Sequence, residues 1–153
     1  MYENKKNILN FCNETHYKFR FLKEFKEILN LAQKEFNIKK NISVDLLLTD
    51  NENIKQISNT YRNKNKPTDI LSFPTDWNQL NFLDILPIGE IIISYEKVKE
   101  QAKEYGHSIK REYCYLFAHG IAHLFGFDHL TKEEEDKMNY YVDNIMKKME
   151  INR

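Results

Sequence analysis

The sequence has little cysteine, glycine or proline, and it has no excess of charge of either sign. Its two cysteines, Cys12 and Cys114, lie far apart, which excludes a disulfide-rich scaffold and fits a reducing compartment. The 23 Lys and Arg residues balance the 23 Asp and Glu residues, so net charge does not argue for a nucleic-acid or membrane partner. No apolar run approaches the roughly 20 residues of a membrane span, and no secretory signal follows the first residues. We therefore expect a cytoplasmic protein.

A chain of 153 residues is long enough for one domain with a substantial core, and no repeat or linker rich in glycine and proline divides it. We expect a single domain over residues 1–153. Apolar spacings of three and four residues and capping boxes predict about five helices, while β-branched runs predict strands. The helices are expected from Phe19 to Phe36, after Thr49, through Val98 to Tyr105, from Ser108 to Gly126 and after Thr131. The strands are expected at 7–13, 42–48, 70–73 and 88–94. This order predicts a small α+β domain with one sheet.

Three of the five histidines lie between His119 and His129. His119 and His123 are four residues apart, so on a helix their imidazoles project from one face. His129 lies further on, and Gly126 permits a turn that brings it back as a third ligand. Three imidazoles with one open position are typical of a catalytic zinc, which lowers the pKa of its bound water towards about 7. The segment therefore predicts one zinc ion per chain, although such a ligand set also accepts nickel or copper.

The same histidine spacing is found in the metzincin proteases. A zinc protease has its general-base Glu directly after the first histidine, and this chain has Gly120 there, which opposes peptide hydrolysis by that route. Asp128, next to His129, is a candidate catalytic residue that would orient an imidazole or act on the metal's water. A turn aspartate that bonds its own backbone remains the alternative for Asp128.

The segment from His119 to His129 resembles the motif H-G-x-L-H-L-x-G-Y-D-H of the YbeY family of bacterial endoribonucleases, with Ala122 and Phe127 at the two substituted positions. A second family signature, P-T-D-V-L-S-F-P, appears as P-T-D-I-L-S-F-P at residues 67–74. Further matches are Asn59, Tyr61-Arg62, Gly106-His107-Ser108, Arg111-Glu112 and Gly89-Glu90-Ile91, the last with Glu where the family usually has Asp. These matches extend over about residues 59–129, and so the resemblance covers essentially the whole domain.

The resemblance implies a zincin-like fold with a mixed sheet and zinc bound by His119, His123 and His129. It implies a zinc-dependent, single-strand-specific endoribonuclease in ribosomal RNA processing, with 16S rRNA 3′ end maturation and ribosome quality control as its roles. The implied partners are single-stranded RNA and small-subunit ribosomal RNA, with small-subunit ribosomal proteins as possible further partners. A peptidase and a non-catalytic ribosome-assembly factor with structural zinc remain the alternatives.

RNA cleavage needs a positive group at the phosphate, and Arg62 is the candidate, because a guanidinium grips phosphate oxygens bidentately. In the family the matching arginine is regarded as functional. Lys64 and Lys66 continue a basic loop that is suited to an RNA backbone. We expect Trp77 and Phe82 to be buried anchors of their loop rather than platforms for bases.

Carboxylates and a hydroxyl near the two signatures are expected to support the site. Asp69 and Ser72 are expected to shape the entry to their strand. Glu112 lies two turns before His119 on nearly the same helical face, so it is expected either to orient an imidazole or to form a surface ion pair.

Overall fold

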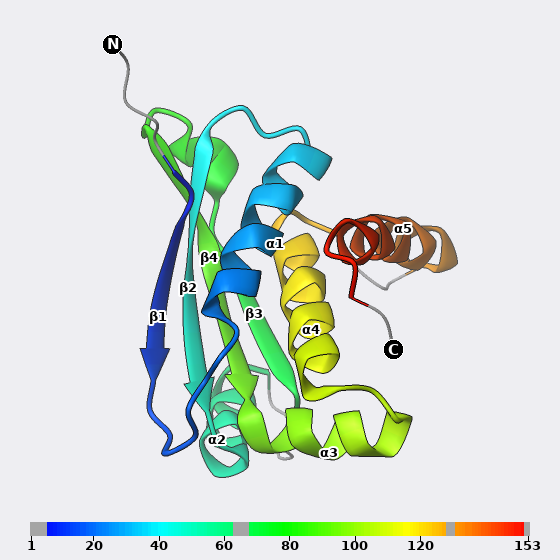
Figure 1. Ribbon diagram of the computed structural model, residues 1–153. Coiled ribbons are helices and arrows are strands. Elements are labelled where there is room, and N and C mark those ends of the chain that lie inside the picture. Colours follow the sequence, from blue (N-terminus) through cyan, green and yellow to red (C-terminus); the bar gives the residue numbers. More distant parts are fainter. Residues whose placement is uncertain (1–5, 63–67, 128–130, 152–153) are drawn as a thin grey trace.

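The computed structural model describes residues 6–62, 68–127 and 131–151. Its centre is a four-stranded sheet in the order β1-β2-β4-β3 (Figure 1). The strands are β1 (Ile8–Asn13), β2 (Asn41–Thr49), β3 (Ile70–Pro74) and β4 (Ile85–Ser94). β1 and β4 both run parallel to β2, whereas β3 runs antiparallel to β4. The predicted α+β fold with a mixed sheet is confirmed.

Five α-helices accompany this sheet in the described residues. They are α1 (Leu22–Glu35), α2 (Asn51–Arg62), α3 (Tyr95–Tyr105), α4 (Ile109–Leu124) and α5 (Lys132–Lys148), and a short 3-10 helix, η1 (Trp77–Leu80), lies between β3 and β4. Figure 1 shows α1 and α4 side by side, with α5 beyond α4 and with α2 and α3 at one end of the sheet. None of the helices in the described part of the chain is long and apolar enough to cross a membrane.

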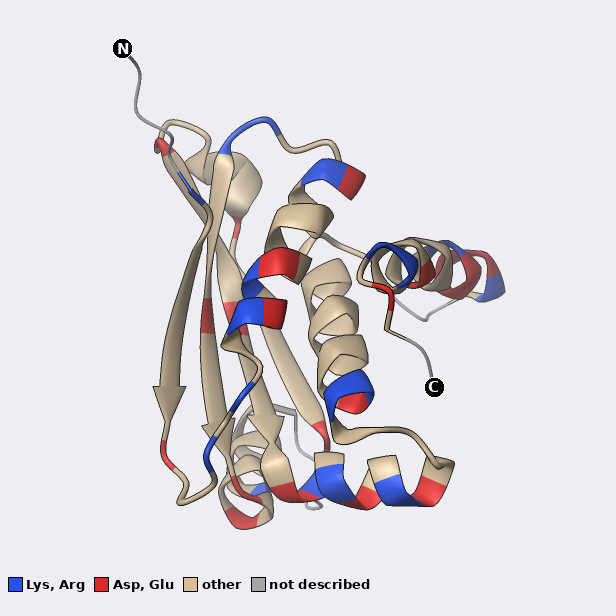
Figure 2. Ribbon diagram, viewed as in Figure 1, with Lys and Arg blue, Asp and Glu red and all other residues tan. Residues whose placement is uncertain are grey.

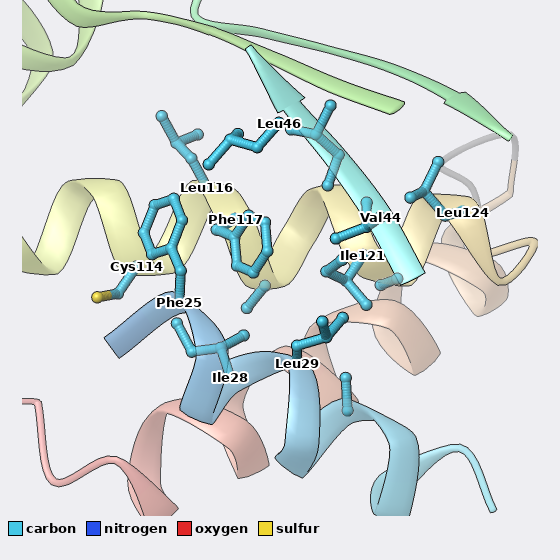
Figure 3. Close-up of a cluster of buried hydrophobic side chains, with 14 of the residues drawn as sticks. Phe25, Ile28, Leu29, Val44, Leu46, Cys114, Leu116, Phe117, Ile121 and Leu124 are labelled. Carbon is cyan, nitrogen blue, oxygen red and sulfur yellow. The ribbon is translucent and has the colours of Figure 1, made fainter. Parts of the chain in front are cut away.

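The main core lies between the sheet and the helices α1 and α4 (Figure 3). Alternate residues of β2 are buried, as the two-residue period of a strand requires: Ile42, Val44, Leu46 and Leu48. Phe25 of α1 stacks on Phe117 of α4 with ring centroids 4.2 Å apart. A smaller buried cluster of Ile54, Leu71 and Ile92 joins α2 to β3 and β4. α4 is therefore enclosed by neighbours along most of its length.

The expected helix starts differ from the structure in two places. α1 begins at Leu22 rather than Phe19, because the Phe19 ring packs at 5.0 Å from both Phe25 and Tyr113 before the helix starts. At the start of α2, Asp50 Oδ1 accepts a hydrogen bond from the Asn53 amide at 2.8 Å, so Asp50 is the cap rather than Thr49. The helix start expected near Ser108 and the cap expected at Thr131 are confirmed, since the Ser108 and Thr131 side chains accept hydrogen bonds from the amides of Arg111 and Glu134.

The loop around η1 fulfils one expectation and contradicts another. Trp77 is partly buried, and its Nε1 donates to the Leu124 carbonyl at 3.2 Å, so it anchors the loop to the end of α4 as predicted. Phe82 is 77% exposed, and the prediction of burial is wrong for this residue. The indole has a backbone acceptor within reach, whereas Phe82 lies in a turn beyond the end of η1 and packs against neither cluster of the described core.

Candidate active site

A pocket of about 730 Å³ lies between β3 and the C-terminal half of α4. Its lining includes His119 and His123 from α4, and Asp69 and Ser72 from the segment that enters and forms β3. Tyr61, near the end of α2, lies at its edge and is 71% exposed. The pocket therefore brings together residues from three separate stretches of the sequence.

The two imidazoles share one side of α4, as their spacing predicted. Their ring centroids are 5.0 Å apart and their planes are inclined by 57°. The helix ends directly after them: the Phe125 amide donates to the Ile121 and Ala122 carbonyls, and Gly126 then has a φ of 101°. That φ suits glycine, which accounts for the turn expected at this point.

Burial along α4 follows a strict pattern. From Arg111 to Leu124 the half-buried residues are Arg111, Tyr115, His119 and His123, each four positions after the last, and every residue between them is buried. Since residues four apart lie on one face of a helix, α4 exposes a single narrow row of side chains. Figure 2 shows that Lys, Arg, Asp and Glu occur in α4 only near its N-terminal end.

Gly120 allows α4 to lie close to the sheet. A Cβ built at this position would be 2.9 Å from Ile70 Cδ1 and 3.1 Å from Ile91 Cδ1. A larger side chain here would press on the ends of Ile70 and Ile91, which would have to shift, and Gly120 itself lines the pocket.

Gly89 of β4 has a comparable role beside the pocket. Its φ is 147°, and an added Cβ would overlap the Phe73 carbonyl oxygen and come within 2.8 Å of Leu124 Cδ2. Phe73 of β3 lines the pocket and Leu124 ends α4. The glycine therefore allows β3 and the end of α4 to pack closely against β4.

The family model described as Endoribonuclease YbeY matches residues 7–150 of the chain. This chain belongs to the YbeY family. The Endoribonuclease YbeY of Mycoplasmopsis pulmonis is 48% identical over 148 residues, which cover 96% of this chain and 99% of that protein. The Endoribonuclease YbeY of Mycoplasma mobile is 50% identical over 148 residues, covering 96% and 97%. The solution structure of TM1509 from Thermotoga maritima is similar with a TM-score of 0.59 and 26% identity, covering 95% of this chain and 92% of that chain.

Several candidate site residues from the sequence fall outside the described residues: Lys64, Lys66, Asp128 and His129. Arg62 ends α2 directly after Tyr61, but only its backbone is described. Within residues 6–62, 68–127 and 131–151, no three His, Cys, Asp or Glu residues form a group that could hold a metal ion. Two of the three predicted ligands, His119 and His123, lie inside those ranges.

Asp69 contributes to the site in two ways. Its backbone oxygen accepts a hydrogen bond from the Ser94 amide at 3.0 Å, which ties the start of β3 to the end of β4. Asp69 also lines the pocket, as does Ser72. The expected support of the strand entry is therefore seen for Asp69, together with a carboxylate close to the histidines.

The two glutamates of the matched motifs, Glu112 and Glu90, lie in different surroundings. Glu112 is only 6% exposed and forms no ion pair with any described residue, so the surface ion pair is wrong. Burial, and secondarily the Asp69 carboxylate, raise the pKa of Glu112. Glu90 is paired in register with Asp45 of β2, and it does not line the histidine pocket. Partial burial and the Asp45 charge raise the pKa of Glu90.

Proposed function

We propose that this chain is a zinc-dependent endoribonuclease that cleaves single-stranded RNA during ribosomal RNA processing. The observation that carries the proposal is the pair of imidazoles, His119 and His123, one helical turn apart on the wall of a 730 Å³ pocket. Membership of a family described as endoribonucleases supports RNA as the substrate.

The donor set fits a zinc ion. Two imidazoles at a spacing of four residues on one helical face are a common pair of zinc ligands, and His129, five residues after the end of α4, is the proposed third. A zinc ion held by these imidazoles would supply a water of lowered pKa for hydrolysis. The residues of the chain then have to hold the RNA against this centre.

Arg62 is the proposed phosphate-binding residue, because its guanidinium stays charged and matches the phosphate oxygens. α2 ends at Arg62, next to Tyr61 on the pocket edge, so its backbone lies close to the pocket. Lys64 and Lys66 follow it and are proposed to contact the RNA backbone. Asp128 is proposed to orient an imidazole or accept a proton at the carboxylate. Single-stranded RNA is favoured because its bases can be splayed into a pocket of this size.

The proposed biological substrate is small-subunit ribosomal RNA, with maturation of the 16S rRNA 3′ end and ribosome quality control as the roles and the cytoplasm as the location. Small-subunit ribosomal proteins are proposed as partners that deliver this substrate. These roles follow from the family resemblance, while the pocket supports the chemistry.

Measurement of zinc content and RNA cleavage for the wild type and for His123→Ala tests this proposal. We expect one zinc ion per wild-type chain, and loss of both zinc and cleavage in His123→Ala. His16→Ala is the matched control, because His16 is exposed and lies outside the pocket. Cleavage that persists in zinc-free His123→Ala would refute the proposal.

The same proteins separate the two alternatives. A peptidase would digest casein and leave RNA intact, a result that Gly120 argues against. An assembly factor with structural zinc would bind one ion, cut no RNA and lose stability when His123 is replaced.

A further inference from the structure

A second pocket, of about 540 Å³, lies beside the N-terminal half of α4. It is lined by residues from the end of α3, the start of α4 and the middle of α5. Its lining residues are Tyr105, His107, Arg111, Glu112, Tyr115, Asn139 and Asp143. Its volume is within the range of about 300–1,000 Å³ that is usual for small-ligand sites.

Glu112 is the unusual member of this lining. It is only 6% exposed and accepts no hydrogen bond from a described residue, but its carboxylate oxygens are not fully buried and reach the pocket. The adjacent Arg111 instead donates from Nη1 to the Ile151 carbonyl at 3.4 Å. A carboxylate that lines a pocket in this state is suited to accept hydrogen bonds from a ligand.

The second pocket lies next to the histidine pocket along α4. Of the four half-buried residues in the row on α4, Arg111 and Tyr115 line the second pocket, and His119 and His123 line the first. The Tyr115 and His119 rings are in contact, with centroids 6.0 Å apart. Asp69, which lines the first pocket, lies close enough for its charge to act on Glu112. A ligand that occupies the first pocket can therefore extend into the second.

The chemistry of the lining favours a nucleobase over a phosphate. Glu112 and Asp143 would repel a phosphate, and among the described lining residues Arg111 is the one Lys or Arg side chain against them. Tyr115 and the 59% exposed Tyr105 offer aromatic faces, and unstacked bases of single-stranded RNA bind proteins by stacking on such rings. A carboxylate pairs with base edges that carry amino groups, and Asn139 adds an amide that donates and accepts.

We propose that the second pocket binds the base of a nucleotide near the cleaved bond of single-stranded RNA, and that Glu112 accepts hydrogen bonds from the amino-bearing edge of that base. Guanine fits best, because it presents two neighbouring N–H donors on its Watson–Crick edge. Uracil fits worst, because it has no amino group and its one imino donor is flanked by carbonyl oxygens. The RNA context rests on the proposed function, whereas base binding by the pocket can be measured without cleavage.

The first test is an NMR titration of the protein with guanosine and uridine 5′-monophosphates. We expect guanosine monophosphate to shift the backbone amides of Tyr115 and Asn139 and to bind about tenfold more tightly than uridine monophosphate, the discrimination of one good bidentate pair. In Glu112→Gln the ratio should fall to about one, because the amide also offers a donor to uracil. Glu104→Gln, an exposed carboxylate outside the pocket, is the control and should keep the wild-type ratio.

Equal binding of the two nucleotides by the wild type would overturn the proposal, as would shifts confined to the residues around His119 and His123. Binding of a diamine such as putrescine at Tyr115 and Asn139, with no nucleotide bound there, would also overturn it and would make the pocket a cation site.

The second test sequences the ends released from a random single-stranded RNA pool by the zinc-loaded protein. We expect uracil to be depleted at one position near the cut, and this depletion to disappear in Glu112→Gln but not in Glu104→Gln. A pool that is cut with the same base pattern by all three proteins would refute the base pocket alone. A pool that the wild type leaves intact would refute the proposed function, and the nucleotide titration would then decide on the pocket by itself.

Discussion

Replacement of Gly89 by alanine tests whether Gly89 is a point at which β4 packs closely against β3 and α4. The φ of 147° is unfavourable for alanine and costs about 1–3 kcal/mol. The added methyl would also overlap the Phe73 carbonyl oxygen and press on Leu124, and overpacking of this kind costs about 1–3 kcal/mol. We therefore expect Gly89→Ala to lower the free energy of unfolding by about 2–6 kcal/mol. With an m-value of about 2 kcal/mol/M in urea, the unfolding midpoint should fall by about 1–3 M.

Gly106→Ala provides the matched control for the clash. Gly106 also has a positive φ, of 70°, but an added Cβ there meets nothing within 4 Å. Its cost is then the backbone cost alone, about 1–2 kcal/mol, or roughly 0.5–1 M in urea. Circular dichroism during urea unfolding measures both variants. Equal midpoints for Gly89→Ala and Gly106→Ala would show that Gly89 is not a point of close packing.

Three further predictions concern α4 and its neighbours. Phe117→Ala removes the fully buried ring that stacks on Phe25 and should lower the free energy of unfolding by about 3–5 kcal/mol in urea titrations, whereas a loss below about 1 kcal/mol would contradict the packing. Trp77→Phe removes the hydrogen bond to the Leu124 carbonyl and should cost about 0.5–1.5 kcal/mol, measured in the same way. Glu112→Gln should be more stable than the wild type above the raised pKa of Glu112, and the difference should be smallest below the ordinary value of 4.5. The folded wild type holds its proton to higher pH than the unfolded chain, so it loses stability as the pH rises through this range. Urea titrations at several pH values measure the difference, and a wild type that gains stability relative to Glu112→Gln over the same rise in pH would contradict this sign.

Local signals were sufficient for most of the fold. Ser108 and Gly126 bracket α4 because the first caps the helix through its hydroxyl and the second takes a positive φ after it. The shared face of His119 and His123 follows from helical geometry alone. The start of α1 could not be predicted in this way, because the Phe19 ring is held by Tyr113, a residue distant in the sequence.

The position of Glu112 could not be predicted from the sequence, for a different reason. Its spacing from His119 suggested a role at the metal centre, but no hydrogen bond or ion pair links it to a described residue, and it lines the second pocket instead. That pocket exists only because α5 brings Asn139 and Asp143 beside α4, which is a tertiary arrangement. Likewise, no sequence pattern indicates that the Phe82 side chain is exposed rather than packed in the core.

The enclosure of α4 links the two pockets to a single physical requirement. The sheet, α1 and α5 cover this helix so completely that one row of half-buried side chains remains accessible, from Arg111 through Tyr115 and His119 to His123. A ligand that reaches the histidines therefore approaches α4 along this row, because buried residues close the other faces. Glu112 borders the row at its far end, where burial, and secondarily the Asp69 carboxylate, raise its pKa. A carboxylate with a raised pKa beside an accessible row of side chains is typical of a binding site, and it favours the proposed contacts to RNA along this row rather than at the histidines alone.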